Sequence, residues 1–122
     1  DELEQAVEKT ADNTGLTLGI AFDYGGRAEI VNAAKQMMED GVPVDEIDER
    51  KFARYLYTAD MPDVDLLIRT GGDFRISNFL LWQTAYSEFY SSEIWWPDFY
   101  GEHIDQAFES FGERQRRFGK RI

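Results

Sequence analysis

The 122-residue chain contains no cysteine, a single histidine and only three prolines. The lack of cysteine excludes disulfides and thiolate metal sites. No apolar run approaches the roughly 20 residues that a membrane-spanning helix needs. The first residues are acidic, unlike the basic and then apolar start of a signal peptide. The lack of a spanning segment and of a signal peptide predicts a soluble, cytoplasmic protein, whereas the lack of cysteine identifies no compartment.

Positive charge is also scarce. The chain has 13 Lys and Arg against 24 Asp and Glu, and its formal net charge is −11. This balance argues against a general nucleic-acid binder, because most of the surface would repel a polyanion. Five of the basic residues nevertheless fall within the last nine positions: Arg114, Arg116, Arg117, Lys120 and Arg121. They either complement the end of a helix or form an arm that grips a small anion.

The apolar content is sufficient for one globular domain. Hydrophobic residues make up 43% of the chain and aromatic residues 15%, and the charged residues are dispersed among apolar segments. Disordered chains do not show this dispersal. We therefore expect a folded chain with a single hydrophobic core.

Hydrophobic periodicity predicts an alternation of helices and strands. Residues 1–10, 28–40 and 48–57 and a segment starting near 102 have helical spacing, and residues 76–84 form a mostly apolar helical stretch. Residues 16–22 and 65–70 are short apolar runs typical of buried parallel strands, and residues 88–91 predict a third, aromatic strand. This alternation predicts an α/β fold with a parallel sheet and flanking helices.

The predicted sheet is thin for such apolar strands, since parallel strands need neighbours and covered faces. Aromatic side chains also crowd residues 79–96, in excess of what so small a sheet can cover. We therefore expect part of the fold to be supplied from elsewhere and most of these aromatics to lie in a core or an interface.

A candidate anion site follows the second predicted strand. In open parallel sheets, ligands bind beyond the carboxyl ends of strands, and residues 69–78 occupy that position. Arg69 and Arg75 offer forked donors, two glycines allow close backbone approach, and Ser77 can cap the following helix. The pattern is neither a P-loop nor a dinucleotide fingerprint. It indicates a phosphate-like anion, unless the arginines only pair with carboxylates such as Asp73 and Ser77 is only a helix cap.

Beyond this physical pattern, residues 65–90 closely resemble the undecaprenyl diphosphate synthases, which are cis-prenyltransferases. The resemblance covers nearly all of the chain. Further matching segments are residues 13–18, Tyr24-Gly25-Gly26-Arg27, Trp96-Pro97-Asp98-Phe99 and Arg116-Arg117-Phe118-Gly119.

The resemblance implies roles for individual residues. Arg69, Arg75 and Ser77 would bind the diphosphate of isopentenyl diphosphate, with Ile76 contributing backbone. Glu88 would help to hold Mg²⁺, in keeping with the preference of this ion for one or two carboxylates together with phosphates and water. The tail with Arg117 and Gly119 would reach the isopentenyl diphosphate site of the other subunit in a homodimer.

Departures from the family pattern limit what this chain can do alone. The Asp-Gly-Asn-Gly-Arg segment that binds the allylic diphosphate in the family is absent, so residues 1–122 are expected to be a single partial domain, the C-terminal half of the fold, without catalytic residues. Asp23 stands where the family usually has Asn, and Asp73 where Glu is common. Phe74 replaces a histidine of some members and cannot bind metal.

The implied activity is Mg²⁺-dependent condensation of isopentenyl diphosphate with an allylic prenyl diphosphate such as farnesyl diphosphate. The product would be undecaprenyl or another polyprenyl diphosphate, a lipid carrier associated with membranes. This chain alone is expected to be inactive. Two alternatives stay open, a non-catalytic partner subunit of a cis-prenyltransferase and an unrelated phosphate-binding module.

Overall fold

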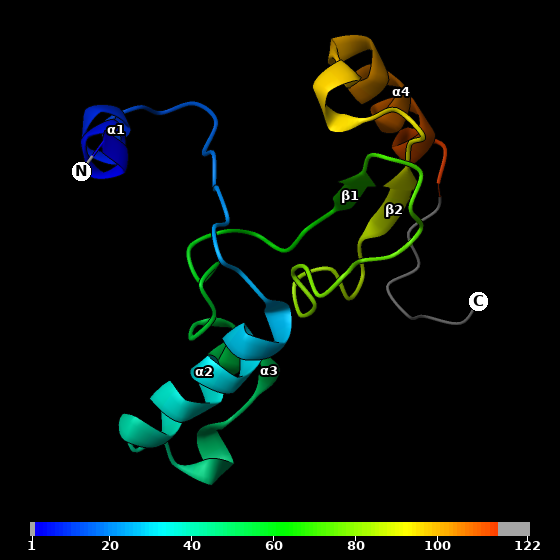
Figure 1. Cartoon of the computed structure of the whole chain (residues 1–122). Helices are drawn as coiled ribbons and strands as arrows, with labels where there is room; N and C mark the ends of the chain where they lie inside the picture. Colours follow the sequence, from blue (N-terminus) through cyan, green and yellow to red (C-terminus); the bar gives the residue numbers. More distant parts are fainter. Residues whose placement is uncertain (1, 115–122) are drawn as a thin grey trace.

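The computed structural model of the chain describes residues 2–114. Arg117 and Gly119 lie outside this range. The described elements, in order, are α1 (Glu2–Thr10), α2 (Gly26–Glu39), η1 (Val44–Glu46), α3 (Glu49–Ala53), β1 (Leu66–Arg69), β2 (Glu88–Ser91), η2 (Trp96–Asp98) and α4 (Gly101–Gly112) (Figure 1). None of the described helices is long and apolar enough to cross a bilayer.

A two-stranded parallel sheet lies at one end of the molecule. Its register pairs Leu66 with Glu88 and Arg69 with Ser91. Helix α4 packs against β2 through a face that buries Ala107 completely. The α/β prediction, a parallel sheet with flanking helices, is therefore confirmed.

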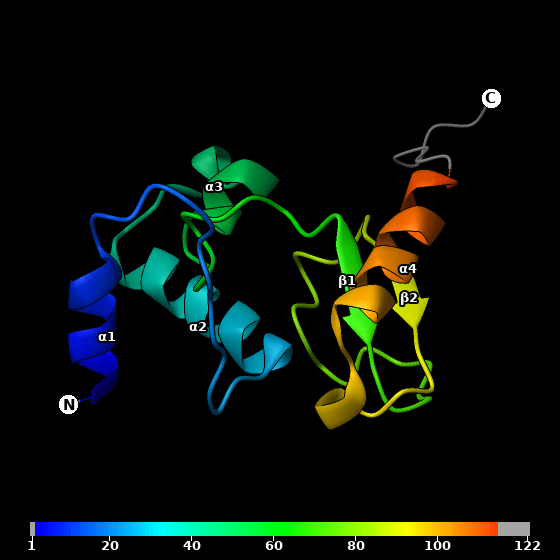
Figure 2. The same ribbon diagram turned by 90° about the horizontal axis from the view of Figure 1, so that it is seen from above.

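Helices α2 and α3 form a second packed region, which lies apart from the sheet and α4 in both views (Figures 1 and 2). Helix α2 buries Ala33 and Met37, and the ring of Phe52 in α3 lies 4.7 Å from that of Trp82. Helix α3 begins at Glu49 because the side chain of Asp48 caps it, accepting a hydrogen bond of 2.6 Å from the Lys51 amide. It ends at Ala53, earlier than the sequence predicts, and irregular turns follow.

The strand predicted at residues 16–22 is wrong for this chain. The segment is irregular, and its large apolar side chains are exposed, with fractions between 63% and 94% for Leu16, Leu18, Ile20 and Phe22. A strand needs a neighbour to satisfy its backbone groups, and among residues 2–114 the sheet contains only β1 and β2.

The helix predicted at residues 76–84 is also wrong. The segment consists of turns, and Ser77, Asn78 and Leu80 have φ values of 52°, 64° and 46°. Left-handed residues cannot continue a right-handed helix. The prediction that Ser77 caps a following helix fails for the same reason.

Glu29 organises a buried polar cluster between α2 and the segments on either side of β1. Its side chain is 1% exposed and accepts hydrogen bonds from the Tyr24 hydroxyl at 2.5 Å, the Tyr57 amide at 2.9 Å and Gln83 Nε2 at 3.1 Å. Gln83 Nε2 also donates to Thr58 Oγ1 at 2.9 Å. Burial and the bond to Glu29 raise the pKa of Tyr24 above its ordinary value, which keeps the phenol a donor. We call these five residues the Glu29 cluster.

Candidate anion-binding site

The segment from Thr70 to Asn78, here called the anion loop, follows directly on β1. Gly71 and Gly72 have φ values of 88° and 79°, a conformation that glycine adopts without strain. Their amides donate to Ile94 O and Ser92 O, both at 2.9 Å. The glycine amides are therefore engaged in anchoring the loop to the chain after β2, which leaves anion binding to other groups.

Arg69 and Arg75 converge on one carboxylate oxygen. Nη2 of Arg69 lies 3.0 Å from Asp73 Oδ2, and Nη2 of Arg75 lies 2.6 Å from the same atom. The carboxylate pairing that the sequence left open as an alternative is therefore present. Each guanidinium uses only one nitrogen in these contacts, so most of its five N–H donors remain for an anion. The formal charge of the triad is +1.

Contacts with β2 hold the loop in place around Asp73. The Ser91 hydroxyl donates to Asp73 O at 3.0 Å, and the ring of Phe74 meets that of Phe89 edge to face at 4.7 Å. Phe89 and Ser91 point to the same face of β2, because side chains alternate along a strand. The loop therefore lies over that face.

A cavity of about 270 Å³ opens beside the two arginines. Arg69, Thr70 and Arg75 line one part of it, and Ile76 and Phe79, which are 37% and 40% exposed, provide apolar surface. The amides of Ile76 and Ser77 donate to no acceptor within the described part of the chain. The cavity thus combines cationic donors with apolar surface, and the free amides of Ile76 and Ser77 belong to the same loop. A larger cavity, of about 650 Å³, lies between α2, α3 and residues 81–86. Neither Arg69 nor Arg75 lines it.

Glu88 lies away from the arginine pair. It is the first residue of β2 and pairs with Leu66, three positions before Arg69, which corresponds to about 10 Å along the strand. Its side chain also points to the face opposite Phe89 and Ser91. Its carboxylate accepts from Arg114 Nη1 at 3.1 Å, and the same nitrogen donates to Phe89 O at 2.9 Å.

The donor set does not fit a Mg²⁺ site beside the arginines. No group of three or more acidic or histidine side chains that could hold a metal occurs between residues 2 and 114. Asp73 is shared by two arginines and Glu88 is paired with Arg114. A Mg²⁺ ion at Glu88 would need oxygen ligands from other molecules or other parts of the protein.

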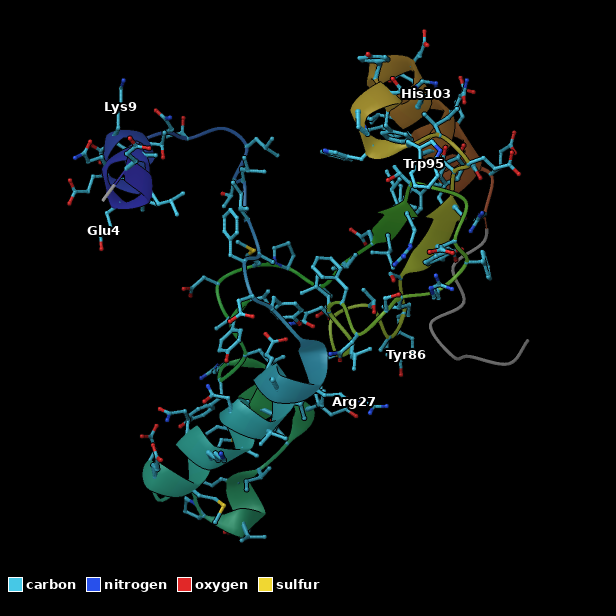
Figure 3. The ribbon with its side chains drawn as sticks, viewed as in Figure 1. Glu4, Lys9, Arg27, Tyr86, Trp95 and His103 are labelled. Atoms are coloured by element: carbon cyan, nitrogen blue, oxygen red, sulfur yellow. The ribbon has the colours of Figure 1, made fainter. Side chains whose placement is uncertain are left out.

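Sequence reasoning missed the part that Asn78 plays. Its main-chain oxygen accepts from the Gly26 amide at 2.8 Å, and its Oδ1 accepts from the Arg27 amide at 2.9 Å across 51 residues. Figure 3 shows Arg27 at the N-terminal end of α2, projecting away from the helix. One signal in the sequence could have indicated it. Helix α2 starts after Gly25, which has no side chain to cap the helix, so another residue has to accept from its first amides.

Comparison with known proteins gives consistent matches along the chain. A family model described as putative undecaprenyl diphosphate synthase matches residues 1–119. An isoprenyl transferase of Neisseria meningitidis is 55% identical over 118 residues, covering 97% of this chain and 47% of that protein. One from Fusobacterium nucleatum is 53% identical, covering 97% and 50%.

Two solved structures share the fold. The lavandulyl diphosphate synthase of Lavandula x intermedia, in complex with dimethylallyl diphosphate, superposes with a TM-score of 0.89 at 37% identity, covering 96% of this chain and 52% of that one. A probable undecaprenyl diphosphate synthase of Campylobacter jejuni gives a TM-score of 0.85 at 36% identity, covering 98% and 55%. The chain spans about half the length of these proteins.

Proposed function

Because the chain belongs to the undecaprenyl diphosphate synthase family, we propose that it carries the isopentenyl diphosphate site of a cis-prenyltransferase. The relatives are isoprenyl transferases, so the reaction class is group transfer. The observation that carries the substrate assignment is the convergence of Arg69 and Arg75 beside a cavity with apolar surface.

The proposed site holds the substrate by its diphosphate. The two guanidinium groups donate to phosphate oxygens with the nitrogens that Asp73 leaves free, and the amides of Ile76 and Ser77 add neutral donors. The Ser77 hydroxyl is a further donor. Ile76 and Phe79 provide apolar surface for the short isopentenyl chain. The clamp leaves the isopentenyl double bond free to react.

In the proposed reaction, this double bond attacks the allylic carbon of a second prenyl diphosphate such as farnesyl diphosphate. A carbon–carbon bond forms, the allylic diphosphate leaves, and a proton is lost to give a cis double bond. The role of this chain is to hold the nucleophilic substrate in position, which lowers the entropic part of the barrier. We assign no catalytic residue to this half.

The complete enzyme is proposed to contain more than this chain. Residues 1–122 form a single partial domain, and the allylic site belongs to the other half of the fold. Mg²⁺ is its proposed cofactor, and Glu88 is the candidate carboxylate, acting with ligands from outside residues 2–114. The enzyme is proposed to be a cytoplasmic homodimer in which Arg117 and Gly119 reach the neighbouring site, and its product is a membrane-associated lipid carrier.

Arg75→Ala is expected to weaken the binding of isopentenyl diphosphate about tenfold. Loss of a charged hydrogen bond costs about 1.5 to 3 kcal/mol, and the exposure of Arg75 favours the lower end of that range. Arg69→Ala is expected to cost more, because its side chain is only 29% exposed. Isothermal titration calorimetry measures both. Arg54→Ala, which removes an exposed arginine at the end of α3, is the matched control; equal affinities for the Arg75→Ala and Arg54→Ala variants would contradict the clamp.

The proposed homodimer rests on exposed aromatic surface. Tyr86, Trp95 and Trp96 are exposed to 66%, 69% and 75%. Apolar surface of this kind favours association with a second copy. Sedimentation of the complete enzyme at micromolar concentration is expected to give a dimer, and Tyr86→Lys is expected to shift it toward monomer. A folded enzyme that stays monomeric would contradict both the proposed interface and the proposed role of Arg117 in the site of a neighbouring subunit.

A further inference from the structure

We propose that Asn78 is a positioning residue of the diphosphate site. It docks the anion loop onto the N-terminus of α2 and thereby holds the amides of Ile76 and Ser77 in place for the substrate. This inference rests on the proposed function, because it names a residue that serves the same site.

Asn78 caps α2 from a distant part of the chain. The first amides of a helix have no acceptor within the helix, and Gly25 has no side chain to provide one. Asn78 provides two acceptors, its main-chain oxygen for Gly26 and its side-chain oxygen for Arg27. Because Asn78 accepts both hydrogen bonds, they fix the distance and the orientation of the loop relative to the helix.

The junction is a direct contact between backbones. Gly26 is buried, and a Cβ atom at this position would lie 2.9 Å from Leu81 Cγ and 3.1 Å from both Asn78 O and Leu81 N. Only glycine allows this approach without displacing the loop. The loop is therefore packed on the start of α2 and is not merely tethered to it.

The loop conformation depends on this docking. Ser77, Asn78 and Leu80 all have positive φ values, an unfavourable conformation for residues other than glycine. Asparagine tolerates it better than most residues. The contacts with α2 offset the cost. Without them, we expect residues 76–80 to relax and the amides of Ile76 and Ser77 to leave the positions that they hold in the docked loop. Asn78 therefore acts through the loop.

Two variants separate this role from simple stability. Asn78→Ala removes the side-chain acceptor for the Arg27 amide, so it weakens both the capping of α2 and the docking of the loop. The double variant Gly25→Ser/Asn78→Ala supplies a new local cap, because Gly25 has extended φ and ψ of −148° and 124° that suit a serine N-cap. In the native chain a Cβ at Gly25 would lie 3.0 Å from Asn78 Nδ2, and truncation of Asn78 removes that contact.

The test titrates inorganic pyrophosphate into the 122-residue chain and measures urea unfolding in parallel. Asn78→Ala is expected to lower the urea midpoint and to weaken pyrophosphate binding about tenfold. The double variant is expected to recover part of the midpoint and to keep the weakened binding. Recovery of affinity together with stability, or native affinity in Asn78→Ala, would overturn the positioning role.

Arg75→Ala in the same titration distinguishes this inference from the proposed function. If the native chain binds pyrophosphate, and Arg75→Ala weakens this binding while Asn78→Ala does not, the positioning role of Asn78 is overturned and the proposed function stands. Absence of pyrophosphate binding by the native chain overturns both.

Discussion

With farnesyl diphosphate, labelled isopentenyl diphosphate and Mg²⁺, the 122-residue chain is expected to form prenyl products at a rate near background. Condensation needs both substrates to be held in one orientation, which is worth about 7 to 11 kcal/mol of the barrier. The proposed function gives this chain one diphosphate clamp, and its sequence lacks the Asp-Gly-Asn-Gly-Arg segment expected for the second substrate. Binding of isopentenyl diphosphate alone leaves most of that barrier in place.

Chromatography of the labelled products measures the rate, and a chain joined to the first half of an isoprenyl transferase relative is the matched comparison. Turnover is expected only in the joined protein. Robust turnover by the 122-residue chain, abolished by Glu88→Gln, would show that this half is sufficient. A second diphosphate site in the other half of the fold would then not be required. A joined protein that folds and binds pyrophosphate but stays inactive would favour a non-catalytic partner subunit.

Glu29→Ala is expected to lower the free energy of unfolding by about 3 kcal/mol or more. The substitution leaves the Tyr57 amide and the Tyr24 hydroxyl without their shared acceptor, while Gln83 Nε2 keeps only its bond to Thr58 Oγ1. A buried donor without an acceptor costs about 1 to 3 kcal/mol. The lost volume adds a cavity where the side chain was 1% exposed. The Glu29 cluster joins α2 to the chain around Gln83, so its loss is expected to loosen the whole junction.

Urea denaturation measures this effect, and two variants serve as its controls. Glu39→Ala removes an exposed carboxylate from the same helix and is expected to change stability by about 0.5 kcal/mol or less. Glu29→Gln keeps the volume and one acceptor oxygen, so its expected cost is about 1 to 2 kcal/mol. A Glu29→Ala variant as stable as Glu39→Ala would show that the cluster contributes little to the fold.

The sequence alone was enough to predict α2, β1, β2 and α4 close to their observed positions. Each has a local hydrophobic pattern bounded by turn residues, and such patterns are set by neighbouring positions in the chain. The exposed side of α2 was harder to predict. Met38 is an apolar residue of the predicted helix 28–40 but is 81% exposed, because burial depends on what packs against the helix.

The secondary structure of residues 16–22 and 76–84 depends on contacts with residues distant in the sequence. The first has the composition of a buried strand but no neighbouring strand within residues 2–114. The second has apolar spacing suited to a helix, but it docks on Gly26 with three left-handed residues. Propensity is a weak local preference that such tertiary contacts override.

For the candidate site, the sequence by itself determined the chemistry and the tertiary structure decided which groups share it. Arg69 and Arg75 follow from residue types in one continuous segment, and the family follows from several segments along the chain. The shared oxygen of Asp73, the ion pair between Glu88 and Arg114, and the docking of Asn78 on α2 join residues whose approach depends on how the elements pack. Hydrogen bonds of this kind require distances near 3 Å, and only the folded backbone determines those distances.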